Sequence, residues 1–176
     1  MDYQNLFNEG LTFAEFVRTS GTEGESFRRR YHKARVPSDL EDRFSDGFCD
    51  HSGLYFLVML ESDCPDALEN VPFLVRLAEM IRIPVRLYRR AQTPELKKHF
   101  ENLGFDRIPT VLVCDGAFSR LGIWQERSRS ADAIVQSIKR DREAGRDPNR
   151  QRRQLIAGYR SGRFHHEMST EILNML

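Results

Sequence analysis

The spacing of apolar residues divides the chain into three zones. Residues 1–47 are highly charged, and their apolar side chains recur at helical intervals, which predicts amphipathic helices. Residues 54–60 read LYFLVML, the longest uninterrupted apolar run, which is typical of a strand buried on both faces. From residue 145 the chain is polar and rich in arginine, and we expect two further short helices there, over about 149–159 and 166–175.

The middle zone predicts alternating strands and helices. Its expected elements are a strand at 54–60, a helix at 65–82, a strand at 85–88, a helix at 94–103, strands at 110–114 and 117–124, and a closing helix at 131–142. This order implies one parallel crossover followed by an antiparallel hairpin. We therefore expect an α/β domain over 49–144, a helical extension over 1–48, and a second helical extension over 145–176 that packs on the domain.

The first zone is expected to hold three or four helices. One or two of them lie within residues 6–17, and another spans about 26–35. The sequence Pro37-Ser38-Asp39 then predicts a break and a helix N-cap, followed by a short helix that carries Leu40 and Phe44.

Composition narrows the class of protein. With 176 residues, 40% of them hydrophobic, the chain is long enough for one domain with a packed core. A formal net charge of +1 argues against an obligate nucleic-acid binder. Three cysteines are too few for a secreted disulfide framework, and neither a signal-peptide pattern nor a membrane-spanning run is visible. We expect a cytoplasmic protein that does not insert into membranes.

Cys64 is the strongest candidate for chemistry. It directly follows the apolar strand, and Pro65 behind it is suited to the first position of a helix. A cysteine at a helix N-terminus is favoured as thiolate by unpaired backbone N–H groups and by the helix dipole. Asp63 and Asp66 flank the thiol and oppose this effect, since nearby negative charge raises a thiol pKa. The sequence leaves the balance between these effects open.

Two further charged side chains have alternative roles. Arg107 either approaches Cys64 and favours its thiolate or lies exposed in its loop. Asp66 either shuttles protons for Cys64 or only complements the helix dipole from the first turn.

Pro72 lies inside the helix that follows Cys64, and the sequence Ile108-Pro109-Thr110 comes just ahead of a strand. Together with Cys64 at the helix start, this pattern resembles the thioredoxin superfamily. The resemblance covers about residues 50–142 and is nearest to a bacterial thioredoxin-like subfamily with a Cys-x-Asp-Ala/Cys motif. It implies a central mixed sheet flanked by helices.

The resemblance also implies roles for individual residues. Cys64 corresponds to the nucleophilic cysteine and Pro109 to the cis-proline beside it, while Ile108 and Thr110 flank that proline, with the Thr110 backbone expected to pair with a bound substrate strand. Ala67 stands where dithiol members carry the resolving cysteine, and Asp63 stands where a tryptophan commonly precedes the motif. Both departures point away from an ordinary disulfide reductase.

Neither of the other two cysteines is expected to resolve a disulfide on Cys64. At the rise of an extended strand, Cys49 lies roughly 20 Å from Cys64 and Cys114 roughly 16 Å, whereas a disulfide needs Cα atoms within ~7 Å. Both are expected to be ordinary core residues. A reaction cycle would then require an outside thiol, such as glutathione or a thiol-bearing protein.

These features support a monothiol thiol-disulfide exchange protein in cell redox homeostasis that acts through Cys64 on a thiol- or disulfide-bearing protein or on glutathione. The alternative is a redox-silent thioredoxin-fold module that uses the same cleft to bind a protein. A third hypothesis is an oxidation sensor whose Cys64 forms a sulfenic acid or a glutathione adduct.

No metal or cofactor is expected. Cys49-Asp50-His51, even with His32, matches no closed zinc set, and His165 and His166 are adjacent in a predicted helix, so their side chains point apart.

Charge is distributed unevenly along the chain. Residues 139–163 carry nine bases and three acids, whereas residues 36–69 carry nine acids and one base. The basic stretch is expected to be a solvated face or to pair with the acidic segment of the same or a neighbouring chain, so a homodimer is left open. Nucleic-acid binding is the less favoured alternative.

Overall fold

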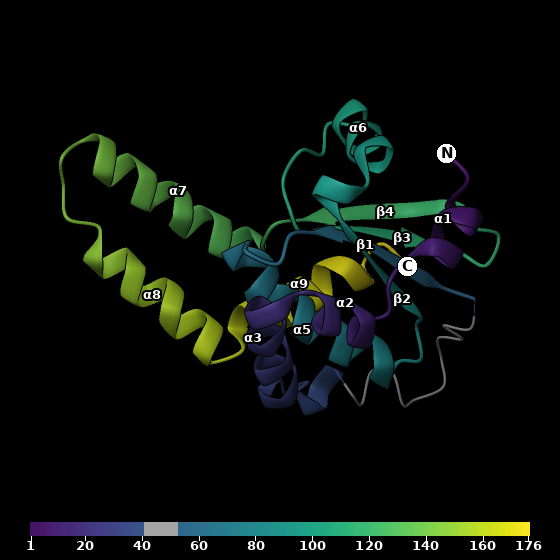
Figure 1. Ribbon diagram of the computed structural model, residues 1–176. Helices are drawn as coiled ribbons and strands as arrows, with labels where there is room; N and C mark the ends of the chain where they lie inside the picture. Colours follow the sequence, from purple (N-terminus) through teal and green to yellow (C-terminus); the bar gives the residue numbers. More distant parts are fainter. Residues whose placement is uncertain (41–52) are drawn as a thin grey trace.

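The computed structural model describes residues 1–40 and 53–176, and its centre is a four-stranded mixed sheet (Figure 1). The strands are β1 (Tyr55–Leu60), β2 (Val85–Arg89), β3 (Thr110–Cys114) and β4 (Arg120–Gln125), in the spatial order β2-β1-β3-β4. Strand β1 pairs parallel with β2 and antiparallel with β3, and β3 pairs antiparallel with β4. The predicted α/β class, with one parallel crossover and one hairpin, is confirmed.

Helices cover both faces of the sheet. They are α1 (Tyr3–Glu9), α2 (Phe13–Thr19), α3 (Gly21–Lys33), α5 (Pro65–Met80), α6 (Pro94–Asn102), α7 (Arg129–Glu143), α8 (Asn149–Arg160) and α9 (Arg163–Leu173), with a short 3-10 turn η1 (Arg90–Gln92) before α6. In Figure 1, α2, α3, α5 and α9 lie on one side of the sheet and α6 on the other. None of these described helices is long and apolar enough to cross a membrane.

The apolar run of β1 is explained by burial on both faces. Phe56, Val58 and Leu60 belong to the larger core, on the side of α5, while Leu57 and Met59 belong to a smaller core that Phe100 of α6 helps to form. Successive side chains of a strand point to opposite faces, so a strand between two cores must be apolar at every position.

The N-terminal helices are part of the larger core. Phe16 of α2 and Phe27 of α3 are fully buried, with their rings 5.2 Å apart in an edge-to-face arrangement. The backbone of Leu11 exchanges two hydrogen bonds with Leu87 and so covers the outer edge of β2. Helices α2 and α3 and the residue Leu11 therefore help to bury the sheet.

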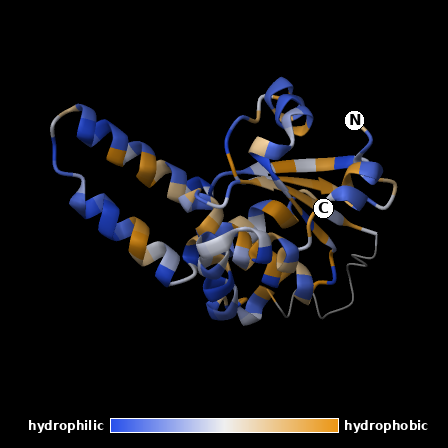
Figure 2. Cartoon of the chain, viewed as in Figure 1, coloured by the Kyte–Doolittle hydropathy of each residue, from blue (hydrophilic) through white to orange (hydrophobic). Residues whose placement is uncertain are grey.

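The C-terminal helices differ in how they pack. Met168 and Ile172 of α9 are buried in the larger core, and the indole of Trp124 donates a hydrogen bond to Glu171 at 2.7 Å. Helices α7 and α8 form an antiparallel hairpin that projects from the body of the molecule, and α8 packs mainly against α7 and α9 (Figure 1). Hydrophobic positions on this hairpin alternate with strongly polar ones (Figure 2).

Some element boundaries differ from those expected. Strand β4 begins at Arg120 rather than at 117, because the Asp115 carboxylate accepts hydrogen bonds from the amides of Ala117 and Ser119 and so lengthens the turn. Helix α3 begins at Gly21 rather than near 26. The predicted helix around Phe44 lies outside the described residues, as do Cys49 and the sequence Asp50-His51.

The junction between α8 and α9 offers a test of this packing. Gly158 lies inside α8, where alanine normally stabilises by about 1 kcal/mol. Here a Cβ at position 158 would overlap the buried ring of Phe164, so Gly158→Ala should instead lower the free energy of unfolding by about 1–3 kcal/mol. Urea unfolding followed by the fluorescence of Trp124, the single tryptophan, measures this change.

The neighbouring exposed residue gives the matched control. Ala157→Gly makes the opposite exchange and should lower the free energy of unfolding by about 1 kcal/mol, through helix propensity alone. A Gly158→Ala variant more stable than the parent protein would contradict the packing of Phe164 against α8.

Candidate functional site

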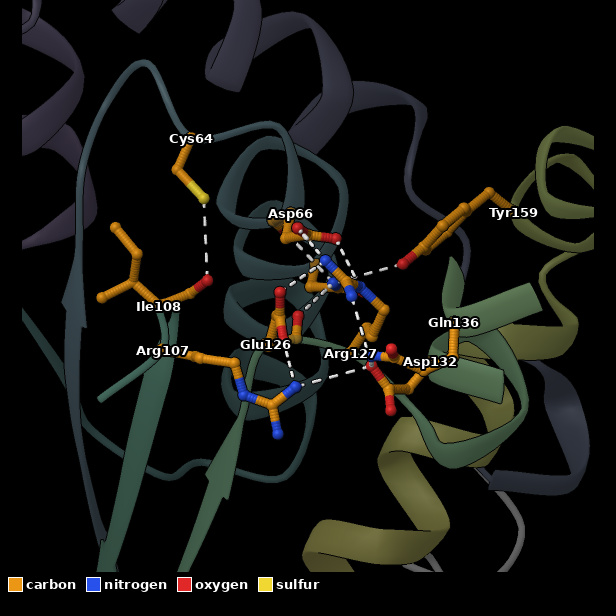
Figure 3. A network of polar contacts seen from close by, with 10 residues as sticks. Cys64, Asp66, Arg107, Ile108, Glu126, Arg127, Asp132, Gln136 and Tyr159 are labelled. Carbon is orange, nitrogen blue, oxygen red and sulfur yellow. Dashed lines mark hydrogen bonds and ion pairs between the residues drawn. The ribbon is translucent and has the colours of Figure 1, made fainter. Parts of the chain in front are cut away.

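Cys64 is the N-cap residue of α5, immediately after the loop that follows β1, and Pro65 is the first residue of the helix. Its side chain is half-buried, and the thiol donates a hydrogen bond of 3.6 Å to the carbonyl oxygen of Ile108 (Figure 3). The peptide bond between Ile108 and Pro109 is cis. Two segments 44 residues apart in the sequence thus meet at one sulfur atom.

The pKa of the Cys64 thiol is raised above its ordinary value. Burial is the largest cause, and the negative charges of Asp66 and Asp63 raise the pKa further. The nearby backbone amides of Ala67 and Asp66 lower the pKa, but they do not outweigh burial. The balance that the sequence left open is therefore set mainly by the half-buried position of the side chain, which favours the neutral thiol.

Arg107 does not approach the thiol. Its guanidinium lies 2.6 Å from the Glu126 carboxylate and 3.5 Å from that of Asp132, on the far side of a polar network from Cys64 (Figure 3). The side chain remains 47% exposed. The prediction that Arg107 favours the thiolate is therefore not supported, because two carboxylates from the end of β4 and from α7 hold it elsewhere.

Arg127 is the residue that sequence reasoning missed. Its guanidinium is only 7% exposed and binds Asp66 through two hydrogen bonds, from Nε at 2.9 Å and from Nη2 at 2.5 Å. It also pairs with Glu126 at 2.6 Å and with Asp132 at 3.3 Å. The Asp66 carboxylate is thus committed to an arginine rather than placed to shuttle protons for Cys64. The sequence around Arg127 is polar, like that of an ordinary loop, and gives no sign that this arginine is buried and paired.

A backbone connection holds the Cys64 helix and the Pro109 loop together. The amide of Glu126 donates to the carbonyl of Pro109 at 2.7 Å, and Glu126 adopts a φ of 63°. The side-chain amide of Asn70, a buried residue of α5, donates to the carbonyl of Glu126 and to that of Asp66, both at 3.0 Å. Asn70 and Glu126 therefore link the first turns of α5 to the segment that faces the thiol.

A family model described as thioredoxin matches residues 10–139. The chain belongs to the thioredoxin family. The matched segment includes α2 and α3 as well as the whole sheet, which agrees with the burial of the N-terminal helices in the larger core.

Two solved structures are similar to this thioredoxin-family chain. A crystal structure of a protein of unknown function from Pseudomonas aeruginosa covers 99% of this chain and 96% of its own, with a TM-score of 0.73 and 24% identity, and so shares the fold including both ends. An HIV epitope-scaffold covers 74% of this chain and 81% of its own, with a TM-score of 0.62 and 27% identity. A search of curated proteins found none that matches.

The thioredoxin fold here corrects one expected role. Thr110 is fully buried in β3, between Met59 of β1 and Gln125 of β4. Since strands occupy both of its sides, its backbone has no free edge for a substrate strand. Ile108 precedes the paired region, and within the described residues its N–H makes no backbone hydrogen bond. Among the described residues, the backbone group beside the thiol that is available to pair with a substrate is therefore the N–H of Ile108.

Cys114 is a buried free thiol, as predicted, and burial raises its pKa to about 11. It pairs with Tyr55 at the start of β1, whereas Thr110 pairs with Met59 near the strand's end, where Cys64 follows. Cys114 therefore lies at the opposite end of the sheet from Cys64 and is not placed to form a disulfide with it.

The adjacent histidines have separate partners. His165 stacks on Phe73 with ring centroids 4.5 Å apart and contacts the Glu69 carbonyl, while His166 lies 2.6 Å from the Asp39 carboxylate. Burial lowers the pKa of His165. The described part of the chain contains no cluster of three or more His, Cys, Asp or Glu side chains suited to a metal ion.

The arginine-rich segment does not pair with the acidic segment of its own chain in the described residues. The partners of Asp39, Asp66 and Glu69 are His166, Arg127 and Arg30, all outside residues 139–163. Among residues 1–40 and 53–176, the one base of that stretch with an ion pair is Arg146, which pairs with its neighbour Asp141. The expected intrachain pairing is wrong for these acids, because the helix that follows Cys64 faces α3 and the loop after β4 instead.

The link through Asn70 leads to a prediction for the site. Asn70→Ala removes the donor to the buried carbonyl of Glu126, so the free energy of unfolding should fall by about 1–3 kcal/mol. The pKa of Cys64 should fall as well, because loosening the Pro109 loop weakens the acceptor at Ile108 and admits water. Urea unfolding and the pH dependence of Cys64 alkylation measure the two effects.

Gln154→Ala provides a control at an exposed polar residue of α8, where we expect a change within about 0.5 kcal/mol and an unchanged pKa for Cys64. An Asn70→Ala variant with the stability of the parent protein would show that the link does not hold the two segments together.

Proposed function

We propose that this thioredoxin-family protein carries out thiol-disulfide exchange through Cys64 alone. The observation that carries the proposal is the half-buried side chain of Cys64 at the start of α5, with its thiol next to the backbone of Ile108. A substrate disulfide bound next to the Ile108 backbone would contact the Cys64 thiol directly. Its chain could pair with the free Ile108 N–H, which replaces the pairing first expected at Thr110.

The exchange would proceed in two balanced steps. The Cys64 thiolate attacks one sulfur of a substrate disulfide, a new S–S bond forms, and the second substrate sulfur leaves as a thiolate that takes a proton from water. Ala67 occupies the position from which a resolving cysteine would act, so the mixed disulfide persists until an outside thiolate attacks the substrate sulfur and releases Cys64. Glutathione or a protein thiol, in a reducing compartment such as the cytoplasm, would supply this outside thiolate.

The raised pKa of Cys64 shapes both steps. At neutral pH only a small part of the thiol is ionised, which slows attack, although each thiolate is intrinsically more nucleophilic. A thiol of high pKa is also a poor leaving group, so the mixed disulfide on Cys64 should be long-lived. The arrangement therefore supports stable adducts more than rapid turnover.

A redox-silent binding module remains the second candidate. The same raised pKa, together with the hydrogen bond from the thiol to Ile108, is what a structural cysteine would show. In that case the Ile108 backbone would bind a partner without covalent chemistry.

Adduct formation tests the proposal. Incubation with a small neutral disulfide should give one mixed disulfide on Cys64, absent in Cys64→Ser and retained in Cys114→Ala, as measured by intact-protein mass spectrometry. The rate should still be rising at pH ~9, above the ordinary thiol pKa of ~8.5, because the folded protein holds the Cys64 pKa high. Alkylation of Cys64 without any disulfide adduct would favour the binding module.

Restoring a second thiol tests the role of position 67. Ala67 lies in the first turn of α5, three residues after Cys64, so a side chain at this position begins close to the N-terminal end of the helix where the thiol lies. Ala67→Cys should convert the long-lived adduct into an intramolecular disulfide and give catalytic disulfide reduction with dithiothreitol as reductant. Ala78→Cys, at another fully buried alanine of α5, is the matched control and should not. An Ala67→Cys variant that forms the adduct on Cys64 but does not turn over would show that a thiol at position 67 cannot resolve it.

A further inference from the structure

Negative charge surrounds Cys64. Asp63 is exposed, and within the described residues it has no ion-pair partner. Asp63 directly precedes Cys64 in the chain and Asp66 follows it by two residues, and the negative charges of both raise the pKa of the thiol. A substrate that reaches the sulfur therefore meets negative charge first.

The bases near the site are held by carboxylates. Arg127 is 7% exposed, whereas its partner Asp66 is 24% exposed, so the carboxylate of this pair is the more accessible member. Arg107 is shared between Glu126 and Asp132. With Asp63, the network holds four carboxylates and two guanidinium groups, and Figure 3 shows the guanidinium groups turned toward the carboxylates and away from Cys64.

We propose that Cys64 selects disulfides flanked by positive charge and disfavours anionic ones, with Asp63 as the main specificity-determining residue. This inference rests on the proposed exchange at Cys64. It names the substrate class as a cationic disulfide, such as a cystine flanked by basic residues or a small diamine disulfide. Glutathione disulfide, which is anionic, would be a poor substrate.

Coulomb's law gives the expected effect of charge on the rate of adduct formation. Two unit charges at ~6 Å in water change an encounter rate about threefold, and reversing the substrate charge doubles the exponent to about tenfold. Salt screens this effect, since the Debye length falls to ~3 Å at 1 M. The charge preference should therefore disappear at high ionic strength, while a preference caused by shape would remain.

Three small disulfides of different charge test the inference. We would measure second-order rates of adduct formation on Cys64 with cystamine, hydroxyethyl disulfide and dithiodiglycolate, each divided by its rate with a neutral reference thiol. We expect cystamine to react about tenfold faster than dithiodiglycolate at low salt. Asp63→Asn should bring this ratio close to one, and Asp63→Lys should reverse it.

The ratio, rather than any single rate, is the readout, because removing a negative charge also lowers the Cys64 pKa and speeds all three reactions alike. Glu143→Gln, at an exposed residue near the far end of α7, should leave the ratio unchanged. Equal normalised rates, or faster reaction of the anionic disulfide, would overturn the inference and leave the proposed exchange intact. Alkylation of Cys64 without an adduct from any disulfide would overturn both.

Discussion

The position of β1 between two cores is the constraint on which the site depends. Its side chains are buried on both faces, and it pairs with β2 on one edge and β3 on the other. A strand that is packed on both faces and paired at both edges fixes the point at which the chain leaves the sheet. Helix α5 begins five residues after the end of β1, with Cys64 as its cap. The antiparallel partner β3 enters the sheet at that same end, which brings Ile108 and Pro109 to the thiol.

Burial then decides the chemical character of the thiol. Helix N-termini lower thiol pKa values when the sulfur is open to the backbone amides and solvent. In this protein the amides of Asp66 and Ala67 lower the pKa of Cys64, but desolvation and two neighbouring carboxylates outweigh them. The result is a neutral thiol that donates to a carbonyl. This distinguishes the site from a cysteine that is activated as a thiolate.

The segments outside the central sheet also contribute to the site. Tyr159 of α8 lies 3.5 Å from the Asn70 side chain, and burial raises its pKa to about 12, so it stays neutral beside the Asp66–Arg127 pair. Helix α9 packs against α5 and, through Glu171, against Trp124. The C-terminal helices thus cover the polar network behind Cys64, and the α7–α8 hairpin extends from this point into solvent (Figure 1).

Much of this protein could be predicted from its sequence. The apolar run at 54–60, the helix that starts at Pro65 and the proline before Thr110 are local patterns, and local patterns determine which elements form and in what order. They were sufficient for the fold class, for Cys64 as the capping residue and for the free, buried state of Cys114. The start of β4 was misplaced because the Asp115 turn depends on side-chain hydrogen bonds that periodicity does not record.

Only the tertiary structure decided which charges meet and how deeply the thiol is buried. Arg107 and Arg127 are both loop arginines in the sequence, yet one remains half-exposed and the other is enclosed by three carboxylates from different elements. Thr110 is placed correctly on its strand, but its neighbours on both sides come from segments far away in the chain. Sequence spacing determines the order of elements, whereas desolvation and ion pairing depend on distances between remote segments, and those exist only after the chain has folded.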